Sequence, residues 1–263
     1  MPTGTHTNGR IAAVSAQGLT KRYRLGEHRG LMLTLQRWLN NSGAYHNRRD
    51  ELGQRFAALS DVNFTCYSGE AIGIVGTNGS GKSTLLQIMA GTTLPSDGEM
   101  RVRGHVVPLP AVGLGFHPEL TGRENVRLFA AALGIPSVAT EGRMDAVTAF
   151  SELDQHMDTP VKRYSSGMLS RLSFGIAMQL PAEIYAFDEV LAVADGEFKL
   201  RCLDAIDGLH KSGRTVMFVS HDLDLVADVC HRVMWLEKGT LREFGPAAQV
   251  LESYQREHAG PTS

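Results

Sequence analysis

Long hydrophobic runs and clustered cysteines are what this sequence most clearly lacks. No stretch approaches the roughly 18 apolar residues that cross a bilayer, and the polar segment 1–10 has no apolar signal-peptide core. The three cysteines, Cys66, Cys202 and Cys230, lie far apart, with no Cys-x-x-Cys or Cys/His ligand spacing. We therefore expect a cytosolic protein with reduced, buried or half-buried thiols and no metal or redox chemistry at cysteine.

Low hydrophobicity and a large excess of one charge, the marks of disorder, are also missing. The chain has 263 residues, of which 43% are hydrophobic and 21% charged, which fits one packed domain or a core with an inserted subdomain. The formal net charge of −2 conceals an uneven distribution, because residues 21–56 contain eight lysines and arginines against three acidic residues. A basic segment thus sits on an acidic body.

Strand-like and helix-like segments alternate along the chain. Ala71–Val75 is a continuous apolar run, typical of a strand that is covered on both faces. Further strand candidates are 11–16, 62–66, 184–187, 215–219 and 233–236, and helical patterns cover 83–90, 124–133, 144–153, 168–180 and 247–258. The order predicts an α/β fold with a parallel sheet, helices on both faces and an inserted helical subdomain.

The strongest motif follows the strand at 71–75. Residues 76–83 read Gly76, Thr77, Asn78, Gly79, Ser80, Gly81, Lys82, Ser83 and fit the P-loop pattern G-x-x-x-x-G-K-[ST], with Thr84 next. Glycines let backbone N–H groups surround a phosphate, and the helix that follows points its positive end at the same anion. Lys82 is expected to neutralise the β- and γ-phosphates, and Ser83 to ligate Mg²⁺. Kinases, GTPases and many ATPases share this motif.

A second motif narrows these classes. The strand candidate 184–187 ends in two adjacent acids, Asp188 and Glu189, which suits a Walker B motif. Asp188 is expected to hold Mg²⁺, directly or through water, and Glu189 to polarise the attacking water. Such a pair is by itself also typical of a helix cap or a solvated turn, so the P-loop upstream is what favours the catalytic interpretation.

Three further segments carry a family resemblance. Tyr164-Ser165-Ser166-Gly167-Met168 resembles the signature of ABC ATPases, usually written LSGGQ, and 191–195 resembles their D-loop. Ser220-His221-Asp222 resembles the switch-histidine motif, in which His221 would contact the γ-phosphate and hold the attacking water. Tyr23 resembles the aromatic residue that stacks on adenine. Because all the motifs fall in one order, the chain resembles ABC nucleotide-binding domains over nearly its whole length.

The resemblance implies a P-loop NTPase (RecA-like) core at about 1–112 and 181–245. It also implies a helical subdomain at about 113–180, a basic insertion at about 24–56 and a C-terminal helix at about 246–260. The cofactors implied are ATP and Mg²⁺, with Ser165, Ser166 and Gly167 meeting the ATP of a second copy in a head-to-tail homodimer. An integral membrane permease, in two copies, would hold the ATPase at the cytoplasmic face of the cell membrane. No nucleic-acid partner is implied.

Finer features resemble one subgroup, the exporters of lipid-linked polysaccharides such as O-antigen, capsule, teichoic acid and cell-wall galactan. They are the signature turn, the segment 188–193 and the segment 113–125, together with the basic insertion. Two features depart from related proteins. No glutamine lies between Gly91 and Gly134, so the usual Q-loop glutamine is missing. We also expect the chain to lack the C-terminal carbohydrate-binding domain that some O-antigen exporters carry. The glycan is expected to be handled only indirectly.

Alternatives remain open at this point. The motifs also fit the ATPase of an ABC exporter for another substrate, or a soluble ABC ATPase without a transport role, although proteins of the latter kind usually carry two ATPase domains. A P-loop kinase would not explain the signature or His221. Within the insertion, Leu31, Met32, Leu35, Trp38 and Leu39 share one helical face. This face either contacts a membrane, permease or lipid head group, or packs on the protein's own sheet.

Overall fold

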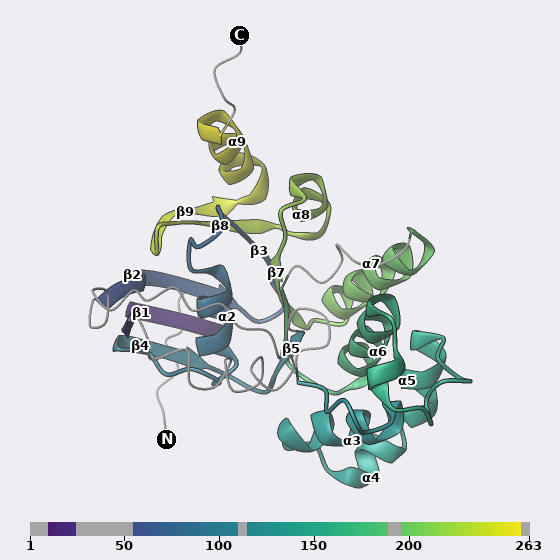
Figure 1. Cartoon of the computed structure of the whole chain (residues 1–263). Coiled ribbons are helices and arrows are strands. Elements are labelled where there is room, and N and C mark those ends of the chain that lie inside the picture. Colours follow the sequence, from purple (N-terminus) through teal and green to yellow (C-terminus); the bar gives the residue numbers. More distant parts are fainter. Residues whose placement is uncertain (1–9, 25–54, 110–114, 189–195, 259–263) are drawn as a thin grey trace, which may run out of the picture.

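The computed structural model describes residues 10–24, 55–109, 115–188 and 196–258. Its central sheet has six strands in the order β5-β6-β7-β3-β8-β9 (Figure 1). The strands are β3 (Ala71–Val75), β5 (Val106–Leu109), β6 (Ile184–Asp188), β7 (Thr215–Val219), β8 (Arg232–Glu237) and β9 (Thr240–Pro246). All neighbours are parallel except β8 and β9. The P-loop NTPase fold class that the sequence predicts is therefore confirmed, with an antiparallel strand added at one edge.

Alternate residues of the central strands enter two separate hydrophobic cores. Ala71 and Val75 of β3 face one core, while Ile72 and Ile74 face the other. This division explains why β3 is apolar throughout and β7 is apolar after Thr215, since each of their residues is buried. The first core is covered by helices α6 (Ser166–Gln179), α7 (Gly196–Lys211), α8 (Leu223–Val229) and α9 (Ala247–His258).

The second core differs from the expectation of helices on both faces. It is closed by helix α2 (Lys82–Met89) and by a three-stranded antiparallel sheet in the order β2-β1-β4. These strands are β1 (Ala12–Arg24), β2 (Arg55–Tyr67) and β4 (Asp97–Val102). The extra sheet is built mainly by β1 and β2, whose buried residues, such as Leu19 and Val62, pack on α2 and the central strands. β1 and β2 pair as far as Arg24 and Arg55, the described residues that flank the predicted insertion.

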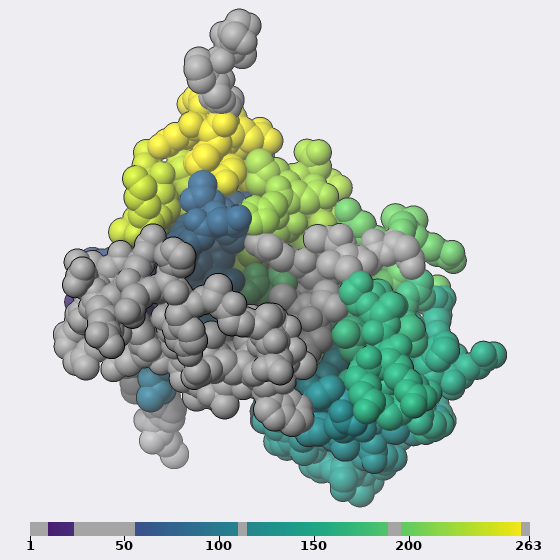
Figure 2. All heavy atoms as spheres, viewed as in Figure 1, coloured from purple at the N-terminus to yellow at the C-terminus, as the bar shows by residue number. Residues whose placement is uncertain are grey.

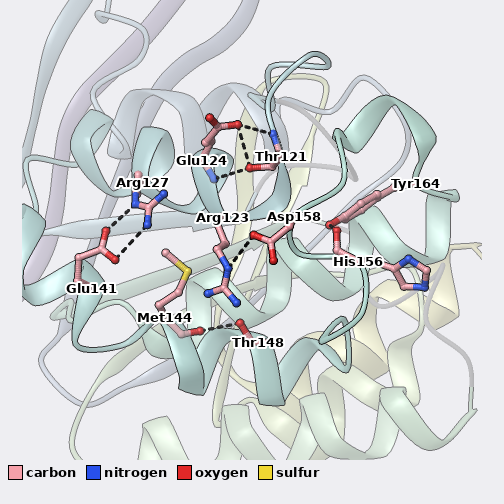
Figure 3. A network of polar contacts seen from close by, with 10 residues as sticks. All are labelled: Thr121, Arg123, Glu124, Arg127, Glu141, Met144, Thr148, His156, Asp158 and Tyr164. Carbon is pink, nitrogen blue, oxygen red and sulfur yellow. Dashed lines mark hydrogen bonds and ion pairs between the residues drawn. The ribbon is translucent and has the colours of Figure 1, made fainter.

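The middle of the chain forms a helical lobe, teal to green in Figures 1 and 2. It contains α3 (Gly122–Ala132), α4 (Ser137–Glu141), α5 (Met144–Ser151), the 3₁₀ turn η3 (Val161–Arg163) and α6. Helix α3 begins at a capping box, because Thr121 and Glu124 each accept a hydrogen bond from the other's backbone N–H (Figure 3). Buried residues of α5 and α6, among them Val147 and Leu172, complete the lobe.

The three cysteines are buried free thiols, as predicted. Burial is the main reason that the pKa of Cys66 is raised, and burial raises the pKa of Cys230 to about 12. Both groups are therefore neutral at ordinary pH. Among the described helices, none combines the length and apolar character that a membrane span requires.

Candidate functional site

Three of the predicted motifs follow neighbouring strands at the same edge of the central sheet. In the sheet order, β7 lies between β6 and β3. Val219 at the end of β7 is level with Asp188 on one side and with Ile74 on the other. Because the strands are parallel, Asp188, the P-loop and the segment after Val219 all lie at their carboxyl ends. Ligands of α/β proteins bind at this edge.

The P-loop owes its shape to two glycines that have no room for a side chain. A Cβ on Gly76 would lie 2.2 Å from the Leu236 carbonyl oxygen, and one on Gly81 would lie 2.5 Å from the Ala58 carbonyl oxygen. Their φ angles, +149° and +106°, are ones that L-residues with a side chain rarely adopt. The loop is therefore pressed against β8 and β2, with α2 starting at Lys82.

Lys82 is buried, with 5% of its surface exposed, and its Nζ donates to the carbonyl oxygens of Gly76 and Thr77 at 2.8 and 3.1 Å. These bonds hold the ammonium group over the loop. The first turn of α2 and the loop amides add partial positive charge at the same place. The electrostatics thus favour an anion with several charged oxygens.

A cavity of about 480 Å³ joins the P-loop to the antiparallel sheet. It is lined by Tyr23, Phe56, Ala58, Asn78, Gly79, Ser80, Gly81, Lys82, Ser83, Thr84 and Asp188. Aromatic and aliphatic groups come from β1 and β2, and polar groups come from the P-loop, α2 and β6. The division suits a ligand with an apolar planar part and an anionic part.

Phe56 is a site residue that the sequence analysis missed. It lies opposite Tyr23 in the β1–β2 register, and the ring centroids are 5.6 Å apart with a tilt of 39°. Phe56 is 48% exposed, which is high for a large apolar residue. The Lys21 Nζ lies over the Tyr23 ring, 4.9 Å from its centroid. Because only the register of β1 and β2 brings Phe56 next to Tyr23, no local sequence motif predicts its place in the site.

The residues predicted to bind Mg²⁺ also meet in this cavity. Ser83, at the start of α2, and Asp188, at the end of β6, both line it. A hydroxyl and a carboxylate oxygen are ligands that Mg²⁺ accepts, with water and phosphate oxygens completing its shell. The donor set therefore fits the ion.

The other predicted residues are absent from the cavity lining or belong to segments that the structure does not describe. His221 follows β7 on the exposed surface and is not part of the cavity lining, while its neighbour Asp222 caps α8 by accepting from the Leu225 N–H at 3.1 Å. Glu189 and the D-loop segment 191–195 lie outside the described residues, as does the segment 25–54 with its predicted helical face.

The signature turn forms a separate, exposed helix start. Ser165 is the N-cap of α6, and its Oγ accepts a hydrogen bond from the Met168 N–H at 3.2 Å. Ser165 and Ser166 are exposed, and Gly167 is half-buried. None of the three lines the cavity formed by the described residues of the same chain.

The P-loop is supported from behind by the turn between β8 and β9. Lys238 and Gly239 both have positive φ angles, as a two-residue hairpin of type I′ requires. The Gly239 N–H donates to the Ser80 carbonyl at 3.0 Å, and the Gly239 carbonyl accepts from the Ser60 N–H at 2.8 Å. This turn therefore ties the P-loop to β2.

Comparisons with known proteins agree with this geometry. Residues 59–192 match the ABC transporter family. The chain is 42% identical over 204 residues to an O-antigen export system ATP-binding protein of Klebsiella pneumoniae, a match covering 78% of this chain and 83% of that protein. It is 41% identical over 200 residues to a teichoic acids export ATP-binding protein of Enterococcus faecalis, covering 76% of this chain and 44% of that protein.

Among solved structures, a dimeric ATP-binding cassette bound to ADP and Pi is similar in fold. The TM-score is 0.70 at 21% identity, over 89% of this chain and 98% of the other. The match of more than half the chain to one family, and the high identity to the Klebsiella protein over most of both lengths, agree with the site geometry. The chain therefore belongs to the ABC transporter family.

Proposed function

We propose that this chain is the ATP-binding and ATP-hydrolysing subunit of an ABC transporter that exports a lipid-linked polysaccharide across the cytoplasmic membrane. The observation that carries the proposal is the 42% identity to an O-antigen export ATP-binding protein over 83% of that protein's length. The similarity to a teichoic acids exporter points to the same class of substrate, a glycan polymer on a lipid carrier.

The cavity supports a role for ATP with Mg²⁺. The adenine would rest against Tyr23 and Phe56, while the P-loop amides and Lys82 would hold the phosphates. Ser83 and Asp188 would hold Mg²⁺, which when bound neutralises charge on the phosphate oxygens. Glu189 follows Asp188 at the strand end and would accept a proton from the attacking water, and His221 would orient that water.

The separate position of the signature turn supports a homodimer. Ser165 and Ser166 are exposed, Gly167 is half-buried, and none of the three lines the cavity formed by the described residues of its own chain, so a second copy is needed to bring them to an ATP. Two chains, head to tail, would then enclose two ATP molecules. Because the closed dimer binds ATP better than the open one, ATP would shift the population toward closure.

A permease is the second partner. The export names of the relatives support an integral membrane protein as partner. In the proposed complex two copies of it hold the ATPase subunits at the cytoplasmic face of the membrane and contain the path of the glycan. The helical lobe at about 113–180 and the core at about 1–112 and 181–245 would be the units that move against each other. An ABC exporter of another substrate, or an ABC ATPase without a transport role, is the alternative.

The test uses the chain carrying Glu189→Gln. This variant should bind ATP normally and lose most turnover, since the proton acceptor is removed while the charge on Asp188 stays. Trapped in the ATP-bound state, it should co-purify from detergent-solubilised membranes with a multi-span membrane protein. Unimpaired hydrolysis would exclude Glu189 as the base, and capture of only soluble partners would favour a role outside transport.

A further inference from the structure

Residues 117–121 and the first turn of α3 form a hydrogen-bonded unit with the segment 156–165, which leads to the signature serine Ser165. We infer that Asn125 and Tyr164 are positioning residues that fix Ser165 and couple its place to residues 117–121. The inference rests on the proposed function, because Ser165 acts on nucleotide only in a dimer. The unit consists of the loop 117–121, the first turn of α3 and the segment 156–165, and we call it the signature clamp.

Asn125 closes the loop at one side of the clamp. Its side chain is buried, with 1% exposed, on the inner face of α3. Its Oδ1 accepts from the His117 N–H at 2.7 Å, and its Nδ2 lies 3.0 Å from the Leu120 carbonyl oxygen and 2.9 Å from that of Thr121. Nδ2 is also 3.1 Å from the His117 carbonyl oxygen. A buried amide with every group satisfied fixes a loop in one conformation.

The loop is joined to the segment before the signature by backbone hydrogen bonds. The Val161 N–H donates to the Leu120 carbonyl at 2.9 Å, and the Lys162 N–H donates to the Pro118 carbonyl at 3.0 Å. An antiparallel bridge pairs Thr121 with Pro160. A displacement of the loop therefore moves the segment 160–162 with it.

The first turn of α3 adds a second connection (Figure 3). The Arg123 N–H donates to the Met157 carbonyl at 3.0 Å, and the Arg123 guanidinium pairs with Asp158 at 3.0 Å. Thus both the loop and the helix that follows it hold the segment that leads to Ser165.

Tyr164 passes this constraint to Ser165. Tyr164 is 8% exposed, and its Oη donates to the His156 carbonyl at 2.7 Å (Figure 3). A Cβ on Gly122 would lie only 2.5 Å from this Oη, so the ring and the start of α3 fit because Gly122 has no side chain. Burial raises the pKa of the Tyr164 hydroxyl, which keeps it a hydrogen-bond donor. Ser165, the next residue, begins α6.

A merely structural role would predict loss of stability alone, so the test separates stability from dimer function. The variants are Tyr164→Phe, Gly122→Ala, their double variant and Asn125→Ala in the full chain. Tyr185→Phe is the matched control, since the buried Tyr185 hydroxyl also donates to a backbone carbonyl, that of Leu180 at 2.9 Å, outside the clamp. Measured quantities are Tm, the Kd of the monomer for a fluorescent ATP analogue, ATP-driven dimerisation, kcat and KM.

Tyr164→Phe and Tyr185→Phe should lower Tm to a similar extent and leave the analogue's Kd unchanged. Only Tyr164→Phe should lower kcat, by about 3- to 10-fold, because a lost buried hydrogen bond is worth a factor of this order. Gly122→Ala should lower kcat further, and adding Tyr164→Phe should restore part of it by removing the Oη that the new Cβ meets.

Equal kcat in the two Phe variants, or no rescue of Gly122→Ala by Tyr164→Phe, would overturn the inference. Asn125→Ala should lower kcat and ATP-driven dimerisation as Tyr164→Phe does, with a larger fall in Tm. Normal dimerisation of Asn125→Ala would also contradict the inference. Wild-type protein is measured first. If it neither dimerises with ATP nor hydrolyses it, the proposed function fails before the clamp is tested, so the two failures are distinct.

Discussion

The P-loop and the signature turn are both glycine-containing segments at the start of a helix, yet their glycines stand in opposite surroundings. In the P-loop, a Cβ on Gly76 or Gly81 would overlap backbone carbonyl oxygens of Leu236 or Ala58. In the signature turn, the nearest atom to a Cβ on Gly167 would be the Ser165 Oγ, at 3.8 Å. Ordinary van der Waals contact is possible at that distance.

The contrast teaches where each constraint originates. Gly76 and Gly81 of the P-loop are required by the fold of this chain alone, whether or not nucleotide is bound. Gly167 lies in a helix, where alanine is favoured over glycine by about 1 kcal/mol. The described residues of this chain leave room for a Cβ at Gly167. A small residue at that half-buried surface position is explained if another surface approaches it closely. Substitutions at the two sites should therefore have opposite effects on stability.

The largest effect is expected for Gly81→Ala. The new Cβ would be placed at a φ of +106° and 2.5 Å from the Ala58 carbonyl oxygen, and relieving strain of about 1–3 kcal/mol would move the loop. Nucleotide affinity should fall about 100-fold at this upper range, and Tm should fall as well. Gly79→Ala is the comparison, since Gly79 has a φ of +80° but open space around it. Equal losses in both would show that backbone conformation alone matters.

Gly167→Ala tests the signature turn. Without a partner chain, the variant should be as stable as the wild type or more so, by up to about 1 kcal/mol. Turnover should nevertheless fall about tenfold or more, because an extra methyl group in a packed interface costs about 1–3 kcal/mol. Gly208→Ala in α7 is the matched control, as a Cβ there meets nothing within 4 Å. Melting curves and ATPase rates are measured for both variants. Full turnover in Gly167→Ala would contradict the idea that another surface approaches Gly167 closely.

The aromatic end of the cavity should show an intermediate effect. Tyr23→Ala and Phe56→Ala should each weaken nucleotide binding by about 1–3 kcal/mol if both rings stack on the base. Titration with a fluorescent ATP analogue measures this loss. Inhibition of that binding by inorganic triphosphate, which has no base, should be unchanged. If only Tyr23→Ala weakened nucleotide binding, Phe56 would line the cavity without stacking on the base.

The smallest effect concerns the ion pairs that join α6 to α7. Glu152 pairs with Arg171 of α6 and with Arg201 of α7, at 2.5 Å for Arg201. Hydrogen bonds from Arg201 and then Arg171 are the main causes that lower the Glu152 pKa below its model-compound value of 4.5. The carboxylate is 43% exposed, so solvent screening limits its contribution to about 0.5 kcal/mol.

A depressed carboxylate pKa stabilises the fold above the unfolded pKa, and this stability is lost as the pH falls through the folded pKa. Glu152→Gln should therefore lower Tm by a small amount at about pH 7, and the difference from wild type should shrink on acidification below about pH 4.5. Glu252→Gln removes a pair with Arg256 in which both side chains are largely exposed, and it should leave Tm unchanged. A difference for Glu152→Gln that persists at low pH would mean that packing, not charge, links α6 to α7.

Local patterns explain which parts of the fold the sequence predicts. The strand Thr215–Val219 and the terminal helix Ala247–His258 have the expected bounds, because an apolar run and a helical periodicity are properties of neighbouring residues. β4 (Asp97–Val102) was not predicted, since its residues are mostly polar and it forms by pairing with β1. Phe56 was missed for the same reason. Its place beside Tyr23 depends on register between strands far apart in the chain.

The short turn at Lys238 and Gly239 has a consequence for variation and engineering. Hairpin turns on a protein surface usually tolerate insertions, tags and changes of length. Here the turn contacts the P-loop directly, because the Gly239 N–H donates to the Ser80 carbonyl oxygen. A Cβ on Gly239 would also lie 2.9 Å from the Ala58 carbonyl oxygen. A peptide inserted at this place should be read out as weakened nucleotide binding. A change in the length of the β8–β9 hairpin should thus affect nucleotide binding, although none of its residues lines the cavity.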